Sequence, residues 1–163
     1  MNEEFRQGII QRLEQAVKCN NLVKVSRSWI PAAASGLFAN KQIKKGQVLT
    51  CYVGEICITK DAIKRYDKSY LMRLGSNVYI DSLNCPLSLA RYINDCRTPT
   101  GYNVTFLKSP SEFCAWVIST RDIAAGEELF VDYGRWYWTG SSLKATPLSY
   151  FQHSKHISSL PTL

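Results

Sequence analysis

The chain has 163 residues, a formal net charge of +7 and 45% hydrophobic residues, which suits one globular domain with a buried core and argues against a disordered or fibrous protein. No run of residues approaches the roughly 20 consecutive apolar positions that a membrane-spanning helix needs. The start MNEEFRQGII has acidic residues where a secretory signal would have a basic end, so we expect an intracellular protein without membrane association.

An amphipathic helix is predicted near the amino terminus, from Glu3 to Lys18. Its apolar residues recur every four positions, at Phe5, Ile9, Leu13 and Val17, with polar residues between them. The alternating residues VKVSRS that follow predict a short strand. We therefore assign residues 1–30 to an N-terminal helical flank.

Short strand-like runs separated by turn signals predict a mostly β domain with few helices over residues 31–138. The runs are GLFAN, QVLTCYVGEICI, NVYID, NVTFL, CAWVIS and ELFVDYG. A helix is predicted at Lys60–Tyr66, and one or two helical turns at Pro86–Ile93. The remaining residues, 139–163, are rich in serine, threonine and proline and form a C-terminal tail.

The cysteine pattern predicts free thiols and no metal site. The six cysteines contain no Cys-x-x-Cys pair, and several lie in apolar runs that favour burial: Cys19, Cys51, Cys57, Cys85, Cys96 and Cys114. His153 and His156 have a spacing that metal ligands use, but two ligands are too few for a closed zinc site.

The positive charge is open to two interpretations. No acidic residue follows Asp132, which suits an acidic or nucleic-acid-bearing partner such as chromatin. A solvated basic surface kept for solubility explains the charge equally well, and no run of five like charges indicates a nucleic-acid-binding arm. Direct contact with nucleic acid therefore remains open.

Five segments, taken in order, resemble the SET domain of protein-lysine methyltransferases. They are ASGLFA, KKGQVLTCYVGE, SYLMRL with YID, SLARYINDC, and CAWVISTRDIAAGEELFVDYGRWYW. The most specific piece is GEELFVDYG, residues 126–134, which matches the closing motif of the family. The resemblance implies small sheets with a C-terminal pseudoknot in which the RYIN and DYG segments meet.

The resemblance also implies S-adenosylmethionine as cofactor and S-adenosylhomocysteine as product. The cofactor pocket would contain Ala34, Ser35, Gly36, Leu37, Tyr70, Arg91, Asn94, Asp95 and Trp136. Tyr133 would be the main catalytic residue, assisted by Tyr52. The channel for the target lysine would be lined by Tyr52, Met72, Val131 and Tyr137.

Methyl transfer suits these residue types. The reaction needs a neutral amine aligned with the methyl group, because an ammonium has no free electron pair. A desolvated aromatic channel lowers the pKa of a lysine, so that its proton can leave to water, and tyrosine faces attract a methylated amine. No acid–base pair is required, which agrees with the lack of a Ser/His/Asp set in the sequence.

The sequence departs from the family pattern at four places. Asp95 replaces a histidine, and Ala34 replaces a glycine, which requires that position 34 does not need a positive φ. No cysteine cluster follows the domain, so we expect the aromatic residues 136–138 to close the pocket. Val131 is smaller than the tyrosine or phenylalanine usual there, which predicts that the channel admits more than one methyl group.

The favoured hypothesis is an active lysine methyltransferase that acts on a histone tail or nucleosome, in the nucleus rather than the cytoplasm. The alternative is a SET domain with weak or no turnover that serves as a peptide- or chromatin-binding module, because of Asp95 and Ala34. An unrelated β-rich interaction protein would leave the order of the five segments unexplained. The oligomeric state stays open.

Overall fold

The computed structural model describes residues 11, 14, 20–31, 33–135 and 137–139. In these ranges the chain is mostly β with few helices, as predicted. Gln11 and Glu14 are helical, but the rest of the predicted helix Glu3–Lys18 lies outside the described residues, as do Cys19, Trp136, the two histidines and the tail beyond Thr139. The domain boundaries therefore remain a prediction.

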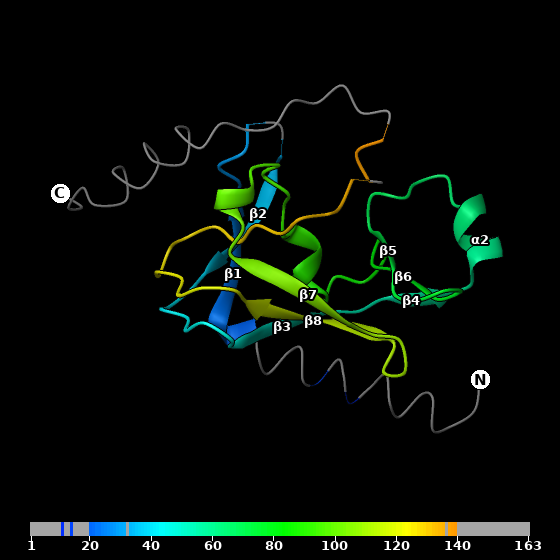
Figure 1. Cartoon of the computed structure of the whole chain (residues 1–163), viewed down its shortest axis with the longest axis horizontal. Coiled ribbons are helices and arrows are strands. Elements are labelled where there is room, and N and C mark those ends of the chain that lie inside the picture. Colours follow the sequence, from blue (N-terminus) through cyan, green and yellow to red (C-terminus); the bar gives the residue numbers. More distant parts are fainter. Residues whose placement is uncertain (1–10, 12–13, 15–19, 32, 136, 140–163) are drawn as a thin grey trace.

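The described strands form three small antiparallel sheets, of strand order β1-β2, β3-β8-β7 and β4-β6-β5. The strands are β1 (Val23–Arg27), β2 (Ser35–Ala39), β3 (Val48–Tyr52), β4 (Glu55–Cys57), β5 (Leu71–Arg73), β6 (Tyr79–Asp81), β7 (Val104–Ser109) and β8 (Cys114–Ser119). Figure 1 shows the β1-β2 pair at one end, the β4-β6-β5 sheet at the other and the β3-β8-β7 sheet between them.

The helical elements whose bounds lie within the described residues are short. They are η1 (Asn20–Leu22), α2 (Thr59–Lys64), η2 (Leu89–Tyr92) and η3 (Pro99–Gly101), of which the three η elements are 3-10 helices. The helix α2 confirms the helix predicted at Lys60–Tyr66, and η2 confirms the helical turn predicted within Pro86–Ile93. In the part of the chain that the structure describes, no helix is long and apolar enough to cross a membrane.

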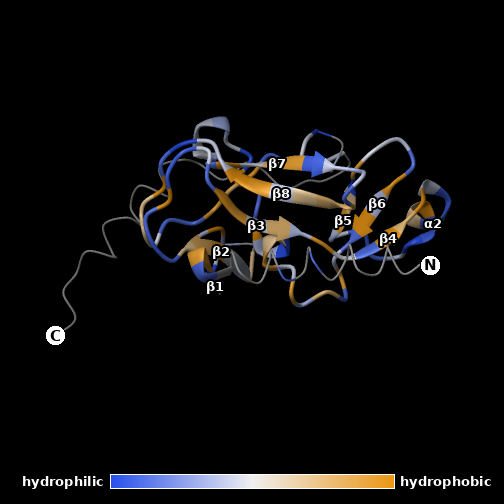
Figure 2. Cartoon of the chain, turned by 90° about the horizontal axis from the view of Figure 1, so that it is seen from below, coloured by the Kyte–Doolittle hydropathy of each residue, from blue (hydrophilic) through white to orange (hydrophobic). Residues whose placement is uncertain are grey.

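The main core lies where the sheets and η2 meet. Figure 2 shows the hydrophobic colouring of β3 and β8, the strands at the centre of the molecule. The largest fully buried side chains of this core include Leu37, Leu49, Ile80, Ile93 and Leu129. Because these residues come from all three sheets, from the residue after η2 and from the closing motif, one core holds the separate elements together.

The closing segment ELFVDYG differs from the prediction, because it forms isolated bridges rather than a strand. On one side, the Leu129 amide donates to the Leu37 carbonyl of β2 at 2.8 Å. On the other side, the Val131 amide donates to the Asn94 carbonyl at 3.1 Å. The segment divides its hydrogen bonds between two neighbours, so no continuous ladder forms. This is the meeting of the RYIN and DYG segments that the pseudoknot implies.

The described cysteines are free, as predicted. Cys85 is partly exposed, and the others, Cys51, Cys57, Cys96 and Cys114, are buried. Within the described ranges, no group of three or more His, Cys, Asp or Glu residues is arranged to hold a metal ion.

Candidate functional site

A cavity of about 350 Å³ lies where four distant stretches of the chain meet, and this volume falls in the range typical of small-molecule sites. The stretches are the turn before β2, the loop before β5, the segment from η2 onward, and the end of the closing motif with the residues after it. The cavity is lined by Ile30, Ala33, Ala34, Ser35, Ser69, Tyr70, Arg91, Tyr92, Asn94, Asp95, Arg97, Tyr133, Tyr137 and Trp138.

Most of the predicted cofactor residues lie on this cavity, namely Ala34, Ser35, Tyr70, Arg91, Asn94 and Asp95. Gly36 and Leu37 are not among its lining residues. The Leu37 side chain is fully buried in the core, and Gly36 packs against Glu128. Ala34 does not have a positive φ, so its replacement of glycine costs no backbone strain.

Asn94 fixes the wall of the cavity that precedes β2. Its side-chain amide donates to the Ser35 carbonyl at 2.8 Å, and lies 3.2 Å from both Ser28 Oγ and Glu128 Oε1. These contacts join the residue after η2 to the turn before β2. The position of the Ser35 backbone therefore depends on the Asn94 side chain.

Glu128 is the buried centre of this arrangement. Its side chain is fully inaccessible, and it accepts hydrogen bonds from Ser28 Oγ at 2.7 Å and from the Trp29 amide at 2.7 Å. Burial raises the pKa of the Glu128 carboxyl, while the bonds from Trp29, Ser28 and Asn94 oppose that rise. A Cβ atom on Gly36 would lie 2.1 Å from Glu128 Oε1. Only glycine therefore fits at position 36.

Asp95 organises the part of the lining that contains Tyr133 and Trp138, and it is 7% exposed. Its Oδ1 accepts from the Arg97 amide at 2.6 Å and the Tyr102 hydroxyl at 2.8 Å. Its Oδ2 accepts from the Tyr133 amide at 3.0 Å and Trp138 Nε1 at 2.7 Å. The negative charge at this position is thus engaged by four donors.

Tyr133 lies at the junction of the cavity and the core. Its hydroxyl donates to the Ile93 carbonyl at 2.6 Å, and its ring contacts Tyr137 edge to face at 4.6 Å between centroids and stacks with Trp138 at 6.1 Å. Burial raises the pKa of Tyr133 far above its ordinary value. The hydroxyl is therefore protonated near neutral pH and acts as a donor.

Three of the four predicted channel residues, Tyr52, Met72 and Val131, lie in or on the core against which Tyr133 packs. Tyr52 and Val131 are buried, and Met72 and Tyr133 pack against the same core. The Tyr52 hydroxyl donates to the Tyr70 carbonyl at 2.7 Å, which links Tyr52 to the cavity wall, and burial raises the pKa of Tyr52. Tyr137 lines the cavity itself and is 44% exposed.

Among the described residues, two arginines on the cavity carry buried N–H groups without a hydrogen-bond partner. The Arg91 guanidinium lies 3.9 Å from the centre of the Tyr70 ring and donates through Nη1 to the Leu83 carbonyl at 2.9 Å, but its Nε has no partner. Arg97 lies 4.6 Å from the Trp138 ring, and its Nη1 has no partner. An acceptor on a bound ligand would satisfy these donors.

Several residues of the site were not singled out from the sequence. Ser28 and Trp29 carry no local signal, because their role depends on Glu128 a hundred residues away. Asn103 is fully buried, donates to the Glu128 carbonyl at 2.8 Å and accepts from the Phe130 amide at 2.8 Å.

Comparison with known proteins gives a family match over most of the described chain, since the SET domain family model matches residues 34–134. One similar relative is the H3 lysine-4 specific histone-lysine N-methyltransferase of Yarrowia lipolytica, 31% identical over 60% of this chain and 9% of the relative. The Saccharomyces cerevisiae protein of the same name is 34% identical over 60% of this chain and 10% of the relative. Human histone-lysine N-methyltransferase SETD1A is 33% identical over 60% of this chain and 6% of the relative. The match thus spans a tenth or less of these relatives.

Proposed function

Because the chain belongs to the SET domain family, we propose that it is a protein-lysine methyltransferase that uses S-adenosylmethionine. The observation that carries the proposal is the position of Tyr133, which lines the cavity, packs on the core that contains Tyr52 and Val131, and keeps its hydroxyl bound to the Ile93 carbonyl. The favoured substrate is a histone tail or nucleosome, because the relatives are named histone-lysine N-methyltransferases, and the favoured location is the nucleus.

The residues of the cavity fit such a cofactor. The volume of about 350 Å³ is adequate for a small molecule. The partnerless N–H groups of Arg91 and Arg97 suit a carboxylate, and the Ser35 and Asn94 wall, held in place by the Asn94 side chain, would contact the adenine. S-adenosylmethionine, when bound, supplies a methyl group on a positively charged sulfur.

The tyrosines of the chain would align and desolvate the target amine rather than deprotonate it. Burial raises the pKa of both Tyr52 and Tyr133, so neither is a phenolate near neutral pH. Their hydroxyls donate to backbone carbonyls, of Tyr70 and Ile93, which fixes the two rings. A lysine amine beside these buried rings would have a lowered pKa and lose its proton to water.

The proposal is tested by incubating the protein with labelled S-adenosylmethionine and core histones. Tyr133→Phe is expected to reduce transfer at least tenfold, and Asn94→Ala to weaken cofactor binding in calorimetry. Tyr66→Phe is the matched control and should keep full activity, because Tyr66 is fully exposed. The proposal fails if the wild-type protein neither binds the cofactor nor labels any protein, and label on arginine would require a different reaction.

The binding-module alternative rested on Asp95 and Ala34. Asp95 accepts four hydrogen bonds, and Ala34 has no positive φ, so neither departure disrupts the cavity wall. A protein that binds a histone peptide without binding S-adenosylmethionine would favour the module.

A further inference from the structure

We propose that Asp95 is a positioning residue that fastens Trp138 across the cavity, so that cofactor affinity depends on a carboxylate–indole contact. The inference rests on the proposed function, because it takes S-adenosylmethionine as the occupant of the cavity. Asp95, Tyr133 and Trp138 all line that cavity. The contact joins two segments 43 residues apart.

The two oxygens of Asp95 have separate partners. Oδ1 holds its own turn, through the Arg97 amide and the Tyr102 hydroxyl. Oδ2 holds the C-terminal side of the site, through the Tyr133 amide and Trp138 Nε1. Hydrogen bonds to a carboxylate are stronger than those between neutral groups, so Oδ2 is a firm anchor for this segment.

Trp138 is held at its edge and on its face. The indole N–H binds Asp95 at 2.7 Å, while the Arg97 guanidinium lies 4.6 Å from the ring centre. Arg97 has a φ of 56°, which is uncommon for a residue other than glycine, and its amide is bound by the same carboxylate. A single side chain therefore sets both contacts on Trp138, the edge directly and the face through the Arg97 turn.

The contacts of Trp138 with Asp95 and Arg97 determine the shape of the cavity as well as the stability of the fold. Trp138 stacks with Tyr133 and meets Tyr137 edge to face at 5.0 Å between ring centroids, so its position sets the aromatic wall. If the indole N–H loses its partner, the ring can leave the wall while the rest of the core stays intact. The expected result is weaker cofactor binding in a folded protein.

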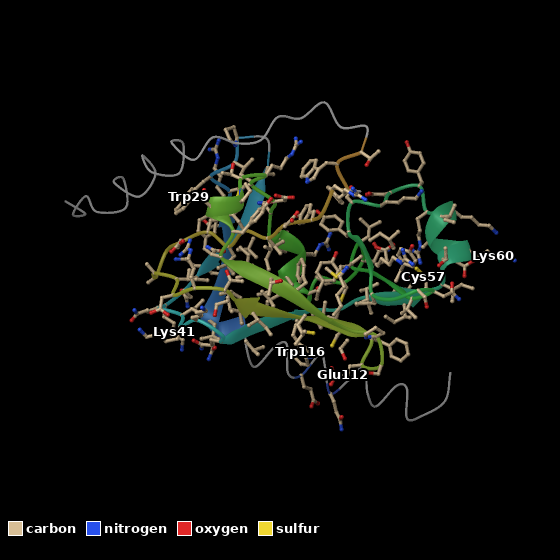
Figure 3. The ribbon with its side chains drawn as sticks, in the orientation of Figure 1. Trp29, Lys41, Cys57, Lys60, Glu112 and Trp116 are labelled. Carbon is tan, nitrogen blue, oxygen red and sulfur yellow. The ribbon has the colours of Figure 1, made fainter. Side chains whose placement is uncertain are left out.

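The test compares two identical substitutions. Trp138→Phe removes the N–H that binds Asp95 and keeps an aromatic ring. Trp116→Phe is the matched control, because Trp116 Nε1 also donates to a carboxylate, of Glu112, at 3.1 Å. Figure 3 shows Trp116 and Glu112 at the lower edge of the molecule, whereas Trp29, which binds Glu128 beside the cavity, lies in the upper part.

Calorimetry with S-adenosylmethionine should show a dissociation constant raised about tenfold by Trp138→Phe, equivalent to about 1.4 kcal/mol. Trp116→Phe should change it less than twofold. In kinetics, Trp138→Phe should raise the KM for the cofactor more than it lowers kcat, whereas Asp95→Ala should change both, because it also releases the Tyr133 amide. Adding Trp138→Phe to Asp95→Ala should have no further effect on binding.

A second readout needs no cofactor. The indole N–H resonance of Trp138, identified by its loss in Trp138→Phe, should shift and exchange faster with solvent in Asp95→Ala. If that resonance does not change, the inference is wrong; equal effects of Trp138→Phe and Trp116→Phe on binding would also overturn it, even if Asp95→Ala fails to fold. A shifted resonance in a protein that binds no cofactor supports the fastening of Trp138 but refutes its role in affinity and the proposed function.

Discussion

Replacement of Gly36 by alanine is expected to destabilise the protein strongly, although it adds only one methyl group. The added Cβ would lie 2.1 Å from Glu128 Oε1 and 2.8 Å from Glu128 Cδ, and real Cβ atoms do not approach within 3.0 Å. Glu128 cannot move aside freely, because Ser28, the Trp29 amide and Asn94 hold its carboxylate. The substitution must therefore break some of these bonds or shift β2.

The size of the effect follows from the bonds at risk. A hydrogen bond to a charged group contributes about 1.5–3 kcal/mol, so the loss of two gives a decrease of about 3–6 kcal/mol in the free energy of unfolding. The whole free energy of unfolding of a typical domain is about 5–15 kcal/mol. The variant should therefore be close to unfolding, and the Ser35 wall should loosen because Asn94 loses its neighbour.

Urea unfolding followed by circular dichroism measures the change. Gly75→Ala is the control, since its Cβ would meet Pro110 Cγ at an ordinary 3.4 Å and should change stability by less than about 1 kcal/mol. In a Glu128→Ala background the obstacle is gone, so Gly36→Ala should then cost less than about 1 kcal/mol. If the cost is the same in both backgrounds, the clash with Glu128 is not its cause.

Three further predictions concern the closing motif. Asn103→Ala should lower the free energy of unfolding by about 2–4 kcal/mol, because its bonds to the Glu128 carbonyl and the Phe130 amide are buried; a loss below about 0.5 kcal/mol in urea unfolding would contradict this. Burial raises the pKa of Glu128, so the folded state takes up its proton more readily than the unfolded state. The stability that this proton uptake contributes is fully present below about pH 4.5 and is lost as the pH rises through the raised pKa of Glu128. The melting temperature of wild type should therefore rise relative to that of Glu128→Gln as the pH falls from 7, and a difference that is independent of pH would refute this. By mass spectrometry of the product, wild type should add more than one methyl group and Val131→Tyr only one, because Val131 is buried in the same core as Tyr52 and a tyrosine there would fill the channel; a wild type that yields only monomethyl-lysine contradicts the first part.

The strands could be predicted where the signal is local. β1 follows from the alternation in VKVSRS, and β7 and β8 from the β-branched and aromatic runs NVTFL and CAWVIS. The segment ELFVDYG has the same composition and was predicted as a strand, but it pairs with β2 on one side and with Asn94 on the other. Composition does not show whether the partners of a segment form one ladder or two.

Many residues of the candidate site could be predicted from the sequence, but their contacts could not. The match to the family pointed to Asn94 and Tyr133, and both lie on the cavity. The bond between Ser28 and Glu128 spans 100 residues, and that between Trp138 and Asp95 spans 43. Such pairings depend on how the elements pack in three dimensions. The sequence around Asp95 therefore shows only that it stands where the family has a histidine.

The double pairing of the closing motif has a consequence for synthesis on the ribosome. Until residues 127–133 have left the exit tunnel, the outer edge of β2 lacks its partner, and the carbonyls of Leu37 and Asn94 await the amides of Leu129 and Val131. The cavity cannot exist before that point, because two of its walls are joined through this segment. A nascent chain would therefore expose an unpaired strand edge, which is prone to aggregation, until residues 127–133 have emerged.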